Sequence, residues 1–211
     1  MRRIVRVWIV ALLCVGWASA QGWATTETPT ALIQQTTTQV LGILKDPSLQ
    51  GPAKRQEREA RLRNTGDQVF DWTAMARSAL AFHWRSLTPQ QRQEFIPLFK
   101  EVVERAFMDR LVQAAQQEKA IRYTGEQEGA SQAVVATRVM TQSDREIPID
   151  YYLHQQQGRW LIYDVIVEGV GLVSNYRSQI DEILASSSYD QLIQRMKAKL
   201  AEGTSASAER P

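Results

Sequence analysis

The sequence predicts an α+β fold in which helices cover a curved, mainly antiparallel sheet. Three observations support this prediction. Apolar residues recur at helical spacing up to about residue 119, the period changes to two between 121 and 168, and the helical period returns from 170. A run of helices, then strands, then helices is typical of an α+β domain. Because a strongly curved sheet backed by long helices encloses a cavity, we expect an apolar cavity here.

The first half of the chain is expected to form three shorter helices and one long helix. Apolar residues at helical spacing predict helices at 29–45 and 70–84. The segment 54–63, KRQEREARLR, is expected to be a charged helix that faces solvent. The long helix begins at Pro89, because Thr88 can act as its N-cap and Gln91 completes a capping box. An apolar stripe follows along this helix as far as Ala114. The stripe predicts that one face of the long helix is buried.

Four strands are expected at 121–128, 132–141, 146–155 and 159–168, where apolar and polar residues alternate. The connections between them are short enough for antiparallel hairpins, so the sheet is predicted to be four-stranded. After the last strand the chain turns at Gly169 and forms helices at 170–184 and 189–200. Glu168 precedes the first of these helices, where a negative charge suits the unsatisfied N–H groups.

The first twenty residues are expected to be a cleavable secretion signal. Arginines precede a short apolar run, and the small residues Ala18 and Ala20 form a cleavage site. We therefore predict a signal peptide at 1–20, cut after Ala20, one domain at 21–202, and a disordered polar tail at 203–211. The single cysteine, Cys14, lies in the signal, so the mature domain must fold without a disulfide.

Charge and motif content exclude several classes of function. The chain has 25 basic and 23 acidic residues, and loss of the three signal arginines leaves 22 against 23, a net charge of −1. No basic stripe with interleaved aromatics remains, so nucleic-acid binding has little support. We see no metal-ligand spacing, nucleophile elbow or phosphate-binding glycine loop, and we expect no metal and no cofactor.

Histidines and carboxylates offer little support for catalysis. His83 lies near a helix end, where it would complement the dipole, and His154 is expected to be exposed. Asp164 and Glu168 share a strand face but would lie about 13 Å apart at roughly 3.3 Å per residue. That separation is too long for a shared proton, so capping, or pairing with Arg138 or Arg177, is the preferred role. We therefore expect a binding protein and no catalytic residues.

The segment 160–177, WLIYDVIVEGVGLVSNYR, resembles the signature of the MlaC family, also called toluene-tolerance auxiliary proteins. The matching positions are Trp160, Tyr163, Asp164, Glu168, Gly169, Val170, Leu172, Val173, Asn175, Tyr176 and Arg177. Similar stretches are LTPQQR at 87–92, with Phe95 and Phe99 downstream, and IPIDY at 147–151. The resemblance covers most of 70–200. Gly171 departs from it, because such proteins commonly have Ser at that position.

This resemblance implies a periplasmic shuttle that carries phospholipid between the outer and inner membranes and so maintains outer-membrane lipid asymmetry. The implied fold is a roll similar to that of nuclear transport factor 2, with a deep apolar cavity. The implied partners are the MCE-domain subunit of an inner-membrane ABC transporter and an outer-membrane lipoprotein–porin complex. We expect a monomer with bound phospholipid as its ligand.

The predicted walls of the lipid pocket come from three elements, although a packed core would have the same composition. They are Phe99, Val103 and Phe107 on the long helix, Ile149, Tyr151 and Leu153 on the third strand, and Leu172, Val173 and Tyr176 on the following helix. Arg177 is a candidate for contact with the headgroup phosphate, and pairing with Glu168 is its alternative role. Three other interpretations remain open: an isomerase or hydrolase on the same roll, a structural periplasmic adaptor, or a carrier of hopanoid-type lipid.

Overall fold

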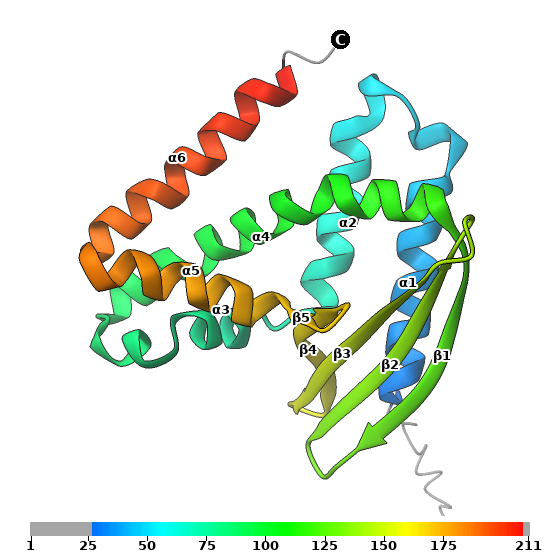
Figure 1. The fold of residues 1–211 in the computed structure, drawn as a ribbon, viewed down its shortest axis with the longest axis horizontal. Coiled ribbons are helices and arrows are strands. Elements are labelled where there is room, and N and C mark those ends of the chain that lie inside the picture. The colour runs from blue at the N-terminus through cyan, green and yellow to red at the C-terminus, as the bar shows by residue number, and fades with distance from the viewer. Residues whose placement is uncertain (1–26, 209–211) are drawn as a thin grey trace, which may run out of the picture.

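A computed structural model describes residues 27–208 (Figure 1). The predicted signal peptide and its cleavage site lie outside the described residues. In chain order the helices are α1 (Pro29–Lys45), α2 (Arg55–Val69), α3 (Trp72–Leu80) and α4 (Pro89–Gln117), followed after the sheet by α5 (Leu172–Ser186) and α6 (Tyr189–Ala208). Three short 3-10 turns connect them: η1 (Pro47–Leu49), η2 (Pro52–Lys54) and η3 (Ala81–Ser86). No helix within 27–208 is long and apolar enough to cross a membrane.

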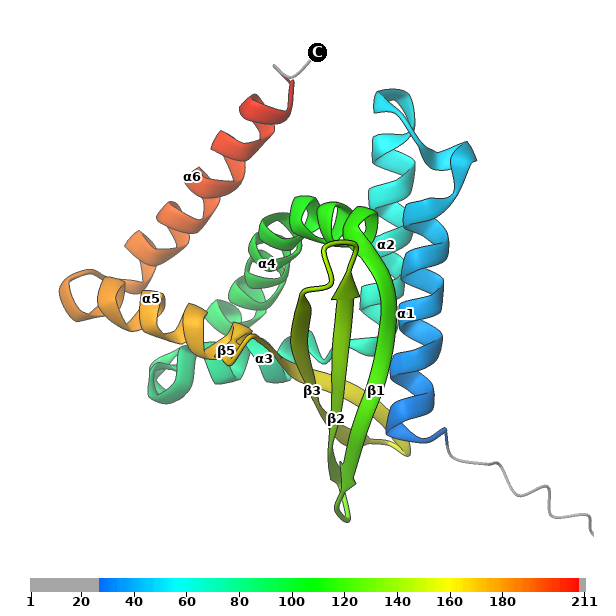
Figure 2. The same ribbon diagram turned by 45° about the vertical axis from the view of Figure 1, so that its right-hand side comes forward.

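The sheet is antiparallel, curved and open, with strands in sequence order. Its strands are β1 (Glu118–Glu128), β2 (Gln132–Thr141), β3 (Glu146–Gln156), β4 (Arg159–Val167) and β5 (Val170–Gly171). Figure 2 shows the strong curvature of β1 at one edge. The predicted α+β class and the four long strands are confirmed, because alternating apolar residues fix which side of each strand is buried.

The sheet has a fifth strand that the sequence did not predict. Glu168 and Gly169 both have positive φ angles, 50° and 81°, which is the backbone of a type I′ hairpin turn. The turn folds the chain back so that Val167 pairs with Val170. The predicted sheet of four strands is therefore one of five, and the next helix begins at Leu172, two residues later than expected.

The N-terminal helices differ from expectation at their ends. The charged helix continues to Val69, and α3 covers only part of the predicted segment 70–84. Its start is delayed because the Asp71 amide donates a 2.8 Å hydrogen bond to the Ile162 carbonyl, which holds this segment beside β4. It ends at Leu80 because Ala81 has a φ of 48°, an uncommon conformation for a residue other than glycine.

The helices form two groups, one behind the sheet and one beside it, and α4 runs from one group to the other (Figures 1 and 2). α1 and α2 pack behind the sheet, where Ile33 and Val69 join residues of β2, β3 and β4 in one apolar cluster. α3, α5 and α6 pack around the N-terminal part of α4 and form a second, larger apolar cluster centred on Phe95 and Phe99. The Thr88 capping box predicted for α4 is present.

The last helix is longer than the sequence suggested. α6 continues to Ala208, so residues 203–208, assigned by composition to a disordered tail, are helical. α6 packs on α4 through Leu192 and Met196 and diverges from α5 (Figure 2).

Candidate lipid-binding site

The inner face of the sheet is the side that carries alternate residues of β2 from Ala133 to Thr141, together with their cross-strand partners. One end of this face is fully covered by α1 and α2, and we call it the closed end. Its residues are at most 5% exposed and comprise Ala133, Val135, Leu153, Trp160 and Ile162. Side chains packed at this level act as core. Leu153, predicted to line the pocket, therefore lies among the core residues.

The other end of the inner face is only half covered, and we call it the open end. Its five apolar residues come from four adjacent strands and are all half-buried: Ile121, Val139, Ile147, Ile149 and Val167. They are neighbours through the strand register, because Val139 pairs with Ile121 and Ile147, and Ile149 pairs with Val167. The open end therefore presents a contiguous patch of apolar side chains in two neighbouring cross-strand rows.

The open end lies where α4 finishes and α5 begins. The Gln142 amide, in the turn between β2 and β3, donates a 2.8 Å hydrogen bond to the carbonyl of Gln117, the last residue of α4. Leu172, the first residue of α5, directly follows β5. These two connections place the open end beside both helices.

Tyr151 lies between the two ends of the inner face. Burial raises the pKa of its phenol to about 12, and nearby Tyr123 adds to the rise. The phenol therefore stays protonated and neutral at physiological pH. It adds a hydroxyl group to a face that also carries the buried hydroxyls of Thr137 and Thr141.

The predicted helical walls divide into core residues and half-buried residues. Phe99, Val103, Val173 and Tyr176 are at most 8% exposed and belong to the large helical cluster. Phe107 and Leu172 are half-buried at the margin of the same cluster. The structure therefore does not gather all nine predicted wall residues around one space. Among the nine, Phe107, Leu172 and Ile149 are apolar residues that remain half-buried outside the packed core.

A pocket of about 90 Å³ lies between α5 and α6, with Phe99 of α4 and Tyr176 of α5 in its wall. The Tyr176 ring packs edge-on against Phe99, with ring centroids 5.5 Å apart. This pocket is separate from the inner face of the sheet, and its volume is small compared with a diacyl lipid.

Arg110, which the sequence analysis did not single out, is better placed than Arg177 for contact with an anion. The Arg177 side chain donates a 2.9 Å hydrogen bond to the Ser78 carbonyl and so ties α5 to α3. Arg110 lies over the Phe107 ring at 5.6 Å. Burial raises the pKa of Tyr176, and the charge of Arg110 opposes that rise. The sequence offered one signal for Arg110. It lies one helical turn beyond Phe107, so the two side chains are neighbours on the same face of α4.

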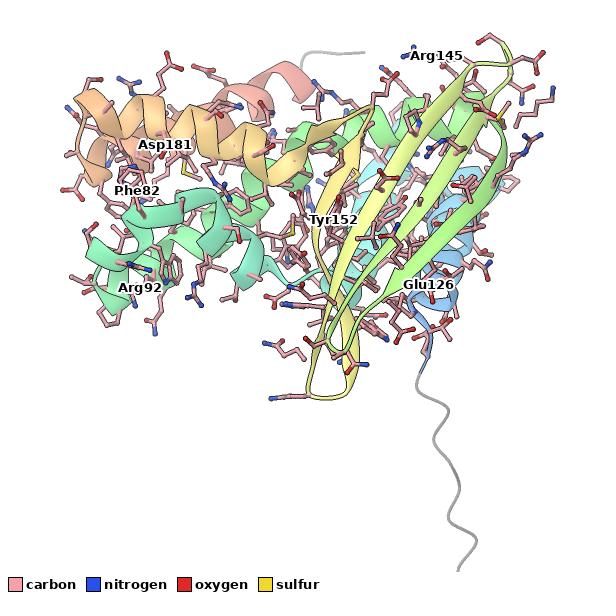
Figure 3. All side chains as sticks on the ribbon, turned by 60° about the horizontal axis from the view of Figure 1, so that its bottom comes forward. Phe82, Arg92, Glu126, Arg145, Tyr152 and Asp181 are labelled. Atoms are coloured by element: carbon pink, nitrogen blue, oxygen red, sulfur yellow. The ribbon has the colours of Figure 1, made fainter. Side chains whose placement is uncertain are left out.

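Asp164 caps α5, and Glu168 does not. Asp164 Oδ1 accepts hydrogen bonds from the Val173 amide at 3.0 Å and from the Val165 amide at 2.8 Å. The predicted capping role is thus correct for Asp164. Glu168 instead pairs with Arg145 at the turn between β2 and β3, so the suggested Glu168–Arg177 pair is wrong. Figure 3 labels Arg145 at this turn and Tyr152 on the face of the sheet turned away from α1 and α2.

Both histidines are paired with carboxylates. His83 Nε2 lies 3.0 Å from Asp181, and His154 Nε2 lies 3.0 Å from Asp71. The expectation that His154 is exposed was wrong, because its side chain is 26% exposed and contacts the N-terminus of α3. The two pairs tie helices and strands together, and neither histidine belongs to the open end.

Comparison with known proteins agrees with this architecture. The sequence profile of the MlaC protein family matches residues 34–198. Toluene tolerance protein ttg2D of Pseudomonas putida is 25% identical over 165 residues, covering 78% of this chain and 76% of that protein. The structure of a phospholipid-binding protein from Ralstonia solanacearum, solved in complex with a phospholipid, superposes with a TM-score of 0.69. It is 22% identical and covers 82% of this chain and 97% of its own, so this likeness supports the fold. Because the profile spans more than half of the sequence, this chain belongs to the MlaC family.

Proposed function

We propose that this protein binds a phospholipid and carries it across the periplasm. Membership of the MlaC family supports this proposal, as does the shared fold with a Ralstonia solanacearum protein that was solved with a phospholipid bound. The observation in this chain that carries the proposal is the open end. Five apolar side chains from four adjacent strands form one contiguous patch and are left half-buried.

An acyl chain at the open end would cover apolar surface that water otherwise contacts. Each methylene removed from water contributes about 0.8 kcal/mol, so burying five methylenes contributes about 4 kcal/mol. Phe107 and Leu172, the half-buried members of the helical walls, would contact the chains from the other side. The interaction needs no nucleophile or metal, because transport leaves the lipid chemically unchanged.

The phosphate of the lipid would lie beside Arg110. This arginine is exposed, and it lies against Phe107, so a chain on Phe107 brings its headgroup within reach of the guanidinium. Guanidinium groups bind phosphate through paired, charge-assisted hydrogen bonds. Arg110 forms no ion pair with the part of the chain whose side chains are described.

Delivery at each membrane belongs to the same proposal. The partners would be the MCE-domain subunit of an inner-membrane ABC transporter and an outer-membrane lipoprotein–porin complex, and the transport would maintain outer-membrane asymmetry. A periplasmic location requires export, which the signal-like sequence at 1–20 supports.

The proposal is tested by purifying the mature protein from a Gram-negative periplasm, followed by native mass spectrometry and lipid extraction. We expect a protein mass increased by one or more phospholipids. Phe107→Trp and Leu172→Trp should each reduce the lipid-bound fraction, because a larger side chain takes the space of the acyl chain. Phe82→Trp is the matched control, since Phe82 is 70% exposed and lies in η3, away from the sheet (Figure 3).

Circular dichroism and thermal melting would confirm that each variant is folded. A lipid-free mass for the folded wild-type protein, combined with no uptake from phospholipid vesicles, would refute the proposal. Equal lipid content in Leu172→Trp and Phe82→Trp would refute the assignment of the wall.

A further inference from the structure

The pocket between α5 and α6 has an apolar lining and a basic rim. Its apolar residues come from three helices and comprise Phe99, Tyr176, Ile180, Ile183, Leu192 and Met196. Its polar residues are Gln179, Arg195 and Lys199. Apolar walls with a few convergent polar groups are characteristic of small-molecule sites. The proposed phospholipid site lies at the sheet and does not include this lining.

The two cations at the rim lie one helical turn apart on α6. Arg195 and Lys199 are both exposed, and neither forms an ion pair with the described side chains. Lys197, which lies between them in the sequence, instead pairs with Glu94 of α4 at 2.9 Å. Like charges at this spacing destabilise a helix by a few tenths of a kcal/mol. An anion bound between them would remove that repulsion.

We propose that this pocket binds the alkyl end of a single-chain anionic amphiphile, whose anionic group is held by Arg195 and Lys199. Gln179, on the facing helix, can donate a further hydrogen bond through its side-chain amide. The ligand class is a fatty acid or a monoacyl phosphate. This site is additional to the proposed phospholipid site and does not depend on it.

The size of the pocket argues for one chain. Its volume of about 90 Å³ is smaller than an engineered apolar cavity of roughly 150 Å³ that takes up benzene. The pocket therefore accepts the end of one alkyl chain and excludes a pair of chains. The cations argue for an anionic head, because a neutral or cationic head gains nothing from them.

The test is methyl NMR of the mature protein with ¹³C-labelled isoleucine and methionine methyl groups. One spectrum reports both regions: Ile180, Ile183 and Met196 report the pocket, and Ile147 and Ile149 report the open end. The probes are dodecyl phosphate, dodecyl maltoside and dodecyltrimethylammonium, each below its micelle concentration. We expect dodecyl phosphate to shift the pocket methyl groups and to bind more tightly than the other two probes. Its affinity should fall as salt concentration rises.

Three variants locate the contacts. Ile183→Trp should weaken binding of dodecyl phosphate roughly tenfold, because it displaces the alkyl end from the pocket. The double variant Arg195→Gln/Lys199→Gln should weaken dodecyl phosphate binding on the order of tenfold and leave dodecyl maltoside unchanged. Lys197→Gln is the matched control, since it removes a charge from the same helix outside the pocket lining.

Several results would overturn the inference. They are unmoved pocket methyl groups in the presence of dodecyl phosphate, equal affinity for all three probes, or an unchanged affinity in Ile183→Trp. A response confined to Ile147 and Ile149 would place the amphiphile at the open end and would overturn this site while supporting the phospholipid site. A response confined to the pocket would support this site, and the phospholipid site keeps its own test by native mass spectrometry.

Discussion

Two phenylalanines on α4 provide a direct test of which predicted wall residues are core. Phe99 and Phe107 lie two turns apart on the same helix. Phe99 is fully buried, with its ring stacked on Phe95 at 5.7 Å and against Tyr176 at 5.5 Å. Phe107 is half-buried at the margin of the same cluster. If fully buried residues are core and half-buried residues form the ligand wall, Phe99→Ala should destabilise the protein much more than Phe107→Ala.

The expected magnitudes follow from these environments. Phe99→Ala leaves a cavity in a packed core and should lower the free energy of unfolding by about 3–5 kcal/mol. Phe107→Ala removes a side chain that keeps part of its surface in water and should cost about 1 kcal/mol. A domain of this kind has a free energy of unfolding of roughly 5–15 kcal/mol, so both variants should fold. Phe99→Ala should retain the smaller part of that free energy.

The assay is urea unfolding followed by circular dichroism on delipidated protein, with the slope of the transition compared between variants. An unchanged slope shows that the midpoint shift reports stability. Phe107→Ala should nevertheless lose phospholipid that the wild-type protein retains. Equal destabilisation by the two substitutions would contradict the assignment of Phe107 to a ligand wall.

Three further predictions concern single side chains. Asp164→Ala should lower the free energy of unfolding by about 1 kcal/mol, because the Val173 amide loses its acceptor at the start of α5, and thermal melting checks this. Burial raises the pKa of the Glu104 carboxyl in the folded state above its unfolded-state value near 4.5. The raised pKa stabilises the folded protein fully at pH values below 4.5, and this stabilisation is lost as pH rises through the folded-state pKa. Glu104→Gln should therefore become progressively more stable than wild type as pH rises to 7, as measured by urea unfolding at several pH values. Arg110→Gln should weaken binding of anionic phospholipid on the order of tenfold and reduce its salt dependence, as measured by vesicle transfer assays.

Each of these predictions has a clear contrary result. Asp164→Asn keeps an acceptor at the same position, so an equal loss in Asn and Ala variants would show that the charge, and not the hydrogen bond, stabilises α5. A stability difference for Glu104→Gln that does not change with pH would contradict the burial of that carboxyl. Unchanged salt dependence in Arg110→Gln would remove this arginine from the headgroup site.

Local features of the sequence were sufficient to predict the long strands and most helices. The bounds of β2 agree with expectation because period-two alternation changes abruptly at Gln132 and Thr141. The start of α4 was predictable because Thr88 and Gln91 form a capping box within four residues. Such signals depend on neighbours in sequence, so one chain suffices to recognise them.

The differences arise where distant parts of the chain meet. β5 exists because Glu168 adopts a positive φ angle, which its residue type does not favour. α3 ends early because Ala81 does the same. His154 is half-buried because Asp71, 83 residues away in sequence, lies beside it. These three features are set by tertiary packing.

Tertiary packing also decides which apolar residues of the site remain accessible, and the sequence alone did not predict this. Leu153 and Ile149 lie on the same face of β3 and have similar side chains, yet α1 and α2 cover only the first of them completely. Apolar periodicity identifies the buried face of a strand, but it does not identify how far along the strand the covering helices extend.

The measurement that tests the central claim most directly is photo-crosslinking with a phospholipid that carries a diazirine at the end of one acyl chain. The account predicts that peptide mapping by mass spectrometry finds label on residues of the open end, such as Ile149 and Val167, and on Phe107. Label confined to the outer face around Tyr152, or to residues at the α5–α6 pocket, would contradict the assignment of the open end as the phospholipid site.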